Sequence, residues 1–279
     1  MIHSLLASIP SPSSGSLHIG PLRLNAYGMM IAVGVIAAVR ISARRAGARG
    51  VATSDDVAAI AMWGVPAGVI GGRVYHVITS LDSFRGHWVE TLYVWHGGLG
   101  IWGGITLGVI AGVWKARRLG IDVTAMMDCA APGIAVAQAI GRWGNWWNQE
   151  LFGRPTSLPW GLSVSDQTAR AAGFPAGMTF HPTFLYESLA CLALAWVLVR
   201  LERTRGNRPG RTFLLYVAGY TVFRFFIEGI RIDPAHHVGG MRLNQWVSLG
   251  VFTAVVSILL VSRRRSAAAP QASTVTDHE

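Results

Sequence analysis

The sequence predicts an all-α integral membrane protein with about seven transmembrane helices. Of its 279 residues, 51% are hydrophobic and 14% are charged, and the mean hydropathy is +0.39. A soluble domain carries about 25% charged residues. Apolar segments recur along most of the chain, and roughly 20 such residues in a helix cross a bilayer core of about 30 Å.

Seven segments are apolar and long enough to be predicted as membrane-spanning helices. They are 24–42, 56–79, 93–114, 123–142, 183–200, 211–229 and 243–262. Small residues are frequent in these segments, which allows close approach between neighbouring helices. The segments predict a single polytopic domain over 1–262, followed by a basic, polar and disordered tail over 263–279.

The positions of arginine and lysine predict the orientation of the chain. Clusters of basic residues follow the first, third, fifth and seventh segments. Cytoplasmic loops carry an excess of these residues, so we expect the N-terminus outside and the C-terminus in the cytoplasm. The net charge of +10 would also suit a nucleic-acid-binding protein. Because the clusters are separated by apolar runs, they do not form one binding face, and no nucleic-acid partner is expected.

Cofactor and metal chemistry have little support in the sequence. The chain has two cysteines, Cys129 and Cys191, each within an apolar run, which is typical of small buried side chains. We find no His/Cys spacing of the kind that binds zinc and no phosphate-binding P-loop. No metal or cofactor is therefore expected.

Ionisable residues within membrane segments are functional candidates by default. The residues that qualify, with the tyrosines near them, include Arg73, Asp128, Arg142, Tyr186, Glu187, Tyr220, Arg224, Glu228 and Arg231. The last four recur at helical spacing in the sixth segment, which places them on one helix face. An Arg224–Glu228 pair that merely permits burial is the structural alternative. It does not explain why other segments also carry arginine.

Several arginines with few acidic neighbours in the sequence indicate an anion site. Arginine stays protonated when it loses contact with water, and its planar fork matches phosphate oxygens. In GRWGNWWNQE, residues 141–150, the fourth segment ends in Arg142 and is followed by Asn145, Asn148 and Glu150. The two amides could orient a hydroxyl or ester oxygen. The anion most available to a bilayer protein is a phospholipid head group.

Three classes of function fit these observations: a lipid-modifying enzyme, a transporter or channel for an anionic solute, and a non-catalytic lipid-binding scaffold. A transporter would favour internal repeats, and none is clear. His96 is the candidate general base, since histidine titrates near neutral pH. A lone histidine at a membrane interface is also commonly a hydrogen-bonded structural residue.

The run GRWGNWWNQELFG, residues 141–153, resembles the signature of the prolipoprotein diacylglyceryl transferases. AYG at 26–28, HPTFLYE at 181–187 and YTVFRFFIEGIR at 220–231 agree with the family in order. The resemblance implies a multi-pass enzyme of the bacterial cytoplasmic (inner) membrane that matures lipoproteins. Its partners would be phosphatidylglycerol, prolipoprotein lipobox segments and membrane lipids. It would transfer diacylglyceryl to the lipobox cysteine thiol without a cofactor, forming a thioether and releasing glycerol phosphate.

The resemblance also implies roles for individual residues. Arg142 would contact the lipid head group with Asn145 beside it. Arg224 would be the second essential cation, held by Glu228, and Tyr27 would line the lipid site. The catalytic candidates are thus Arg142, Arg224, Glu228 and His96. The other substrate-binding candidates are Asn148, Glu150, Tyr220, Arg73, Arg231 and Tyr186.

One position departs from the family pattern. Many members carry a histidine proposed as catalytic where this chain has Trp102, and an indole cannot act as a base. His96 lies six residues upstream, almost two helical turns away. An alternative to a histidine base is that the positive potential of Arg142 and Arg224 lowers the pKa of the substrate thiol. Replacing His96 with glutamine separates the two possibilities.

Overall fold

The computed structural model describes residues 8–12, 14–19, 22–94, 97–206 and 208–268. Its long helices are α1 (Ala26–Ala48), α2 (Ser54–Thr79), α3 (Ile101–Arg118), α4 (Val123–Asn148), α6 (Thr183–Arg205), α7 (Arg211–Ile230) and α8 (Leu243–Ala268). The short helices are η1 (Leu81–Phe84), η2 (Trp88–Leu92) and α5 (Asp166–Ala171). The strands are β1 (Ile9–Pro10), β2 (Ser16–Ile19), β3 (Leu22–Asn25), β4 (Leu162–Ser163), β5 (Thr179–Phe180), β6 (His237–Val238) and β7 (Met241–Arg242).

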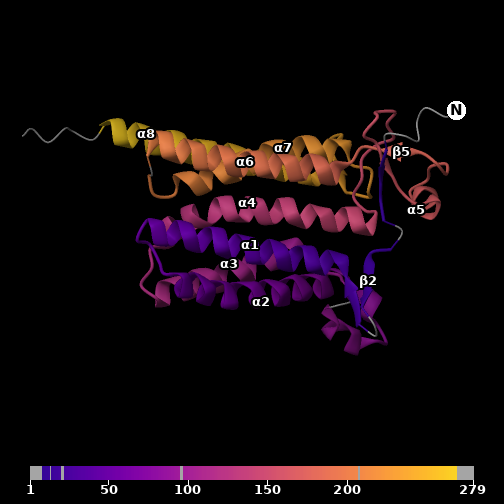
Figure 1. Ribbon diagram of the computed structural model, residues 1–279, viewed down its shortest axis with the longest axis horizontal. Helices are drawn as coiled ribbons and strands as arrows, with labels where there is room; N and C mark the ends of the chain where they lie inside the picture. Colours follow the sequence, from indigo (N-terminus) through magenta and orange to yellow (C-terminus); the bar gives the residue numbers. More distant parts are fainter. Residues whose placement is uncertain (1–7, 13, 20–21, 95–96, 207, 269–279) are drawn as a thin grey trace, which may run out of the picture.

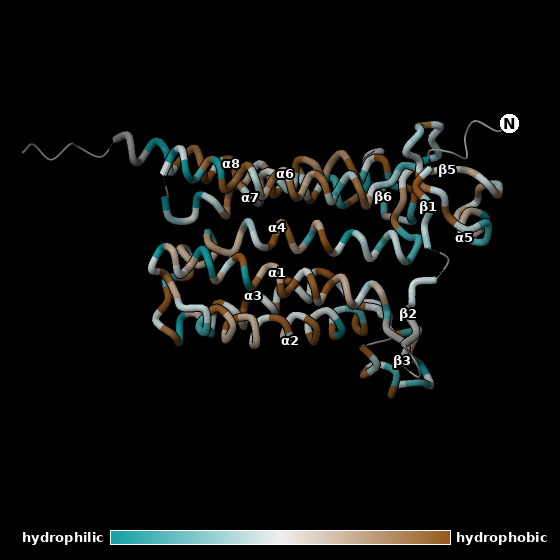
Figure 2. Tube along the Cα trace, in the orientation of Figure 1, coloured by the Kyte–Doolittle hydropathy of each residue, from teal (hydrophilic) through white to brown (hydrophobic). Residues whose placement is uncertain are grey.

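Six helices of the described chain are long and apolar enough to cross a membrane: α1, α2, α4, α6, α7 and α8. The protein is therefore a multi-pass helical membrane protein. α3 has 18 residues, and its last turn carries three basic side chains, Lys115, Arg117 and Arg118. Figure 2 shows apolar residues along the middle of the helices, with polar residues gathered toward their ends.

The helices run side by side along the long axis of the molecule (Figure 1). α4 lies at the centre, with α1, α2 and α3 on one side and α6, α7 and α8 on the other. One end of the bundle carries a compact group of short elements, which we call the head: β1 and residues 149–182. At the opposite end, Arg45 and Arg49 both pair with Glu202 and so join α1 to α6.

Several helix ends differ from the sequence prediction, the end of α1 at Ala48 instead of 42 among them. The third predicted segment began at 93, but α3 begins at Ile101, because Gly97 and Gly98 take left-handed backbone angles with φ of +86° and +70°. α4 continues beyond 142 to Asn148, so most of the signature is helical. α8 runs to Ala268, six residues into the predicted tail, and 269–279 lie outside the described residues.

Glycine allows α2 and α3 to pack backbone against backbone. A Cβ atom added at Gly103 would lie 2.1 Å from the carbonyl oxygen of Gly71, and one added at Gly71 would lie 2.3 Å from the carbonyl oxygen of Gly103. α1 and α4 also approach closely at a glycine, since a Cβ added at Gly133 would lie 2.8 Å from the Ala38 carbonyl oxygen. The small residues of the predicted spans therefore serve helix packing, as expected.

We predict that Gly103→Ala lowers the unfolding temperature in detergent, because the backbone of α2 cannot move aside without disturbing the helix pair. Overpacking of this kind costs about 1–3 kcal/mol. Gly47→Ala is the matched control, since nothing lies within 4 Å of a Cβ added there. Equal unfolding temperatures for the two variants would contradict this account of the α2–α3 contact.

The head is tied to the end of α4. β4 pairs with β1 in parallel and with β5 antiparallel, and Phe152, Phe180 and Phe184 form part of a buried apolar core beneath them. The side chain of Gln149 donates to the Pro12 carbonyl at 2.6 Å and accepts from the Ser165 N–H at 2.9 Å. These small sheets were not predicted. They fix the chain directly after the signature.

Candidate functional site

A network of ion pairs lies where α4, α6 and α7 approach the head. Its centre is Glu187, in the second turn of α6, whose side chain is 2% exposed. Nε of Arg142 lies 3.0 Å from the Glu187 carboxylate, which also accepts a hydrogen bond from Nη1 of Arg224 at 3.4 Å. One buried carboxylate from α6 thus holds an arginine from α4 and an arginine from α7 next to each other.

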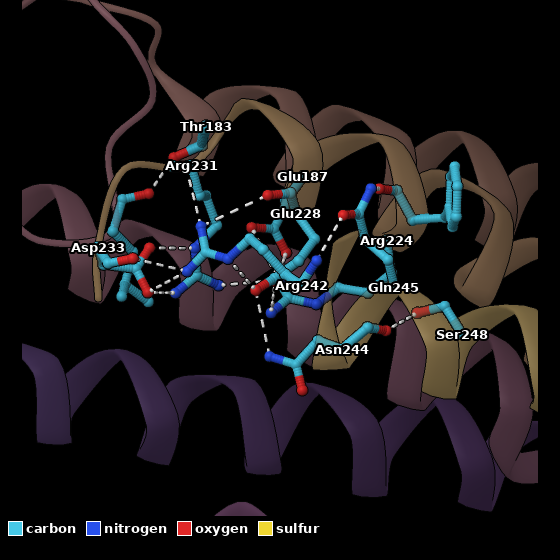
Figure 3. Close-up of polar contacts among 12 residues, drawn as sticks. Thr183, Glu187, Arg224, Glu228, Arg231, Asp233, Arg242, Asn244, Gln245 and Ser248 are labelled. Atoms are coloured by element: carbon cyan, nitrogen blue, oxygen red, sulfur yellow. Dashed lines mark hydrogen bonds and ion pairs between the residues drawn. The ribbon is translucent and has the colours of Figure 1, made fainter. Parts of the chain in front are cut away.

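Glu228 extends the ion-pair network along α7. Its carboxylate is fully buried and forms an ion pair with Nη2 of Arg224, which lies 2.6 Å away and one helical turn earlier. Nε of Arg242 lies 3.0 Å from the same carboxylate, and Nη1 of Arg231 lies 3.5 Å from it (Figure 3). The predicted single face of α7 is confirmed for these charged residues. Their pairing extends well beyond one Arg224–Glu228 contact.

Asp233, in the loop after α7, is the last carboxylate of the ion-pair network. Arg231 binds it at 2.7 and 2.8 Å, and Arg242 binds it at 2.9 Å. Burial alone would raise the pKa of Asp233, but the hydrogen bonds and charges of these two arginines outweigh burial and lower that pKa. Asp233 is therefore ionised near neutral pH and holds the loop against the start of α8.

Negative charge is more abundant here than the sequence indicated. The four guanidiniums are those of Arg142, Arg224, Arg231 and Arg242, and the four nearby carboxylates are those of Glu150, Glu187, Glu228 and Asp233. The expectation of few acidic partners is wrong, because buried guanidiniums need compensating charge and the fold brings it from other elements. The positive charges of Arg142 and Arg224, expected to lower the pKa of the substrate thiol, are offset by Glu187 and Glu228.

The signature residues orient Arg142. Nη1 of Arg142 donates to Oδ1 of Asn145 at 3.3 Å, and Nδ2 of Asn145 donates to Glu150 at 2.7 Å. Glu150 can turn back toward α4 because Gln149 and Leu151 adopt left-handed backbone angles, with φ of 53° and 58°. This strained turn after α4 places a carboxylate behind the amide that positions Arg142.

Tyr27 joins this group from α1. A Cβ added at Gly144 would lie 2.5 Å from Cδ2 of Tyr27, so the ring packs directly on the backbone of α4. The Tyr27 side chain interacts with Asn145 and lies near the charges of Arg142 and Glu150. The structure therefore brings together Tyr27, Arg142, Asn145 and Glu150, as the resemblance implied.

A large apolar cavity opens beside Arg224. Its volume is about 640 Å³, and α3, α4, α7 and α8 contribute its walls. Tyr220 and Trp102 line it together with aliphatic side chains, and Asn244 lies on the α8 side. The cavity has the size and lining of a site for a hydrophobic ligand with a charged group at one point.

Three of the predicted site residues that the structure describes lie apart from this network. Arg73 uses its side chain to bind backbone carbonyls: Nε contacts Thr91 at 2.8 Å and Nη1 contacts Gly97 at 2.7 Å. Tyr186 hydrogen-bonds to His181 and Trp160 near the head. The exposed Asn148 side chain faces Gly15, and His96 lies outside the described residues.

The predicted catalytic and substrate-binding residues did not include three members of the network and one residue of the cavity wall. They are Glu187, Asp233, Arg242 and Asn244. Glu187 lies in HPTFLYE, a run that agrees with the family, so its signal was present, whereas Asn244 stands at the start of the apolar seventh segment. Asp233 lies in a loop and Arg242 in the two-residue strand β7, where no helical periodicity indicates which way a side chain faces.

Comparison with known proteins gives a consistent result. A family model described as prolipoprotein diacylglyceryl transferase matches residues 15–261. The chain is 51% identical over 263 residues to a Streptomyces coelicolor protein named phosphatidylglycerol–prolipoprotein diacylglyceryl transferase 2, covering 93% of this chain and 82% of that protein. It is 48% identical over 276 residues to a Cutibacterium acnes protein named phosphatidylglycerol–prolipoprotein diacylglyceryl transferase, covering 98% of this chain and 92% of that protein.

Proposed function

The chain belongs to the prolipoprotein diacylglyceryl transferase family, and we propose that it transfers the diacylglyceryl group of phosphatidylglycerol to the lipobox cysteine of prolipoproteins. The cysteine sulfur forms a bond to the terminal glycerol carbon of the diacylglyceryl group. The bond between that carbon and the phosphate oxygen breaks, and its electron pair leaves with glycerol phosphate. The thiol proton passes to a base, so atoms and charge balance without a cofactor.

The observation that carries this proposal is a pair of arginines held by Glu187, one of which, Arg224, lines an apolar cavity. Charge develops on the phosphate as the carbon–oxygen bond breaks, and fixed cations stabilise that charge. Nη2 of Arg142 has no protein acceptor among the described residues, so its two N–H groups are open to a phosphate oxygen. We assign Arg142 and Arg224 to the phosphate.

The cavity suits the lipid part of the substrate. Acyl chains bind through apolar area, and aliphatic and aromatic side chains line most of the walls. Tyr220 and Arg224 stand on the same face of α7, so the lipid tails and the phosphate would be held by one helix. Tyr27, Asn145 and Glu150 orient Arg142 from the other side.

We propose that the chain spans the bacterial cytoplasmic membrane seven times as a single domain, with the N-terminus outside and the C-terminus in the cytoplasm. α3 supplies the seventh span, since 18 helical residues extend about 27 Å and its basic end would reach the cytoplasmic surface. This orientation places the head and the arginines at the outer leaflet, where prolipoprotein segments are exposed.

We propose His96 as the acceptor of the thiol proton. Trp102 on the cavity wall cannot accept a proton, and Arg73 anchors the carbonyl of Gly97, the residue next to His96. His96→Gln should lower transfer by about 10²–10⁴-fold, the usual contribution of a general base. Binding of phosphatidylglycerol should not change, and a lipid-binding assay checks this. Transfer at the wild-type rate would exclude His96 from proton transfer.

The test of the proposed function is transfer of radiolabelled diacylglyceryl from phosphatidylglycerol to a peptide with a lipobox cysteine. The purified protein should release one glycerol phosphate for each lipidated peptide. The same peptide with serine in place of cysteine should remain unlabelled. Absence of transfer by folded protein that still binds the lipid would contradict the proposal and favour a binding scaffold.

A further inference from the structure

Asn244 is a polar residue of the cavity wall that also contacts the ion-pair network. It is the second residue of α8 and lines the cavity together with Arg224. Its Nδ2 is 3.2 Å from Oε1 of Glu228. A carboxylate can only accept hydrogen bonds, so the amide nitrogen must face Glu228 and the amide oxygen must face away. Figure 3 shows the Asn244 oxygen directed away from the ion pairs.

The side-chain oxygen Oδ1 of Asn244 has no hydrogen-bond donor among the described residues. Three other polar groups of the cavity wall do have partners. Oε1 of Gln138 accepts from the Tyr216 hydroxyl at 3.0 Å. The hydroxyls of Thr221 and Ser248 donate to carbonyls of their own helices. Asn244 therefore offers an oriented acceptor to whatever occupies the cavity.

The neighbouring charges define what this acceptor can bind. Arginine has only donors, so Arg224 can bind the acceptor oxygens of a ligand but cannot accept a hydrogen bond from its hydroxyls. An ammonium group would bring positive charge close to Arg224 and Arg242, both within the ion-pair network. A hydroxyl donates a hydrogen bond without adding charge. The pair formed by Arg224 and Asn244 thus fits a phosphate carrying a hydroxylated substituent.

We propose that Oδ1 of Asn244 accepts a hydrogen bond from a hydroxyl of the glycerol head group and so selects phosphatidylglycerol over phospholipids whose head group lacks a hydroxyl. The inference rests on the proposed function for the identity of the lipid. The Glu228 carboxylate orients the amide, and Arg224 binds the phosphate next to it. Asn244 is then a substrate-contacting residue that determines specificity and takes no part in proton transfer.

The test compares two lipids of equal phosphate charge, phosphatidylglycerol and phosphatidylpropanol, whose head group has no hydroxyl. Asn244→Ala should lower kcat/KM for phosphatidylglycerol about five- to tenfold, the value of one hydrogen bond. It should leave kcat/KM for phosphatidylpropanol unchanged, so the preference of the wild type disappears. Thr253→Ala is the matched control, because this α8 hydroxyl is exposed and donates to the Leu249 carbonyl outside the cavity lining.

An equal loss with both lipids would show that Asn244 only supports Glu228, and it would overturn the inference. No loss with either lipid would also overturn it. Binding of the two lipids is measured separately by displacement of a fluorescent phospholipid. If the wild type binds but does not transfer, the proposed function fails, while the ratio of the two affinities in wild type and Asn244→Ala still decides the role of Asn244.

Discussion

Arg142→Ala is expected to reduce diacylglyceryl transfer by about 10²–10³-fold or more, the effect of removing one preorganised donor from a developing negative charge. The guanidinium lies between Glu187 and Asn145, so its position is fixed before substrate arrives. Its Nη2 group is open to a phosphate oxygen. Steady-state transfer to a lipobox peptide measures the loss, and lipid binding should weaken with it.

Arg142→Lys tests whether charge alone is sufficient. A lysine keeps the charge but cannot contact Glu187, Asn145 and a phosphate through one planar group. We expect it to recover only a small part of the activity. Arg170→Ala is the matched control, since Arg170 is an exposed arginine in the short helix α5 of the head. Wild-type transfer by Arg142→Ala would remove Arg142 from the site.

Glu187→Ala is expected to reduce both stability and transfer, in contrast to Arg142→Ala, which should mainly affect transfer. The carboxylate is 2% exposed and compensates two guanidiniums from different helices. Removing one partner of a buried ion pair costs about 3–5 kcal/mol, because the remaining charge stays buried. Arg142 and Arg224 would then repel each other, and α4 and α7 would separate where they meet α6.

Glu187→Gln refines this prediction, because glutamine keeps the shape and one acceptor oxygen but loses the charge. Its unfolding temperature in detergent should lie between those of wild type and Glu187→Ala, while transfer should remain strongly reduced. Asp82→Asn is the control, since the Asp82 carboxylate is 86% exposed and forms an exposed pair with Arg85. Wild-type transfer and stability for Glu187→Gln would show that the bridge between the two arginines is unnecessary.

The sequence predicted the helices well because their signals are local. Apolar length placed every long helix, and helical spacing placed Arg224, Glu228 and Arg231 on one face of α7. The start of α3 was misplaced because apolar length does not report left-handed backbone angles. Gly97 and Gly98 adopt such angles before the helix begins.

The site was predicted only in part, because its partners depend on contacts between distant segments. The signature gave Arg142 and Asn145, but which acid binds Arg142 depends on how α6 packs against α4. Arg73 was predicted to bind substrate because it is charged within a span. The structure shows that it holds backbone carbonyls of the loop before α3, a role that no local pattern separates from ligand binding.

The most direct test of the central claim is a structure of the protein with phosphatidylglycerol bound. The account predicts the lipid phosphate within about 3 Å of Arg142 and Arg224, the distance of charge-assisted hydrogen bonds. It also predicts the acyl chains in the cavity between α3 and α8. A phosphate bound instead by Arg231 and Arg242, or acyl chains outside this cavity, would contradict it.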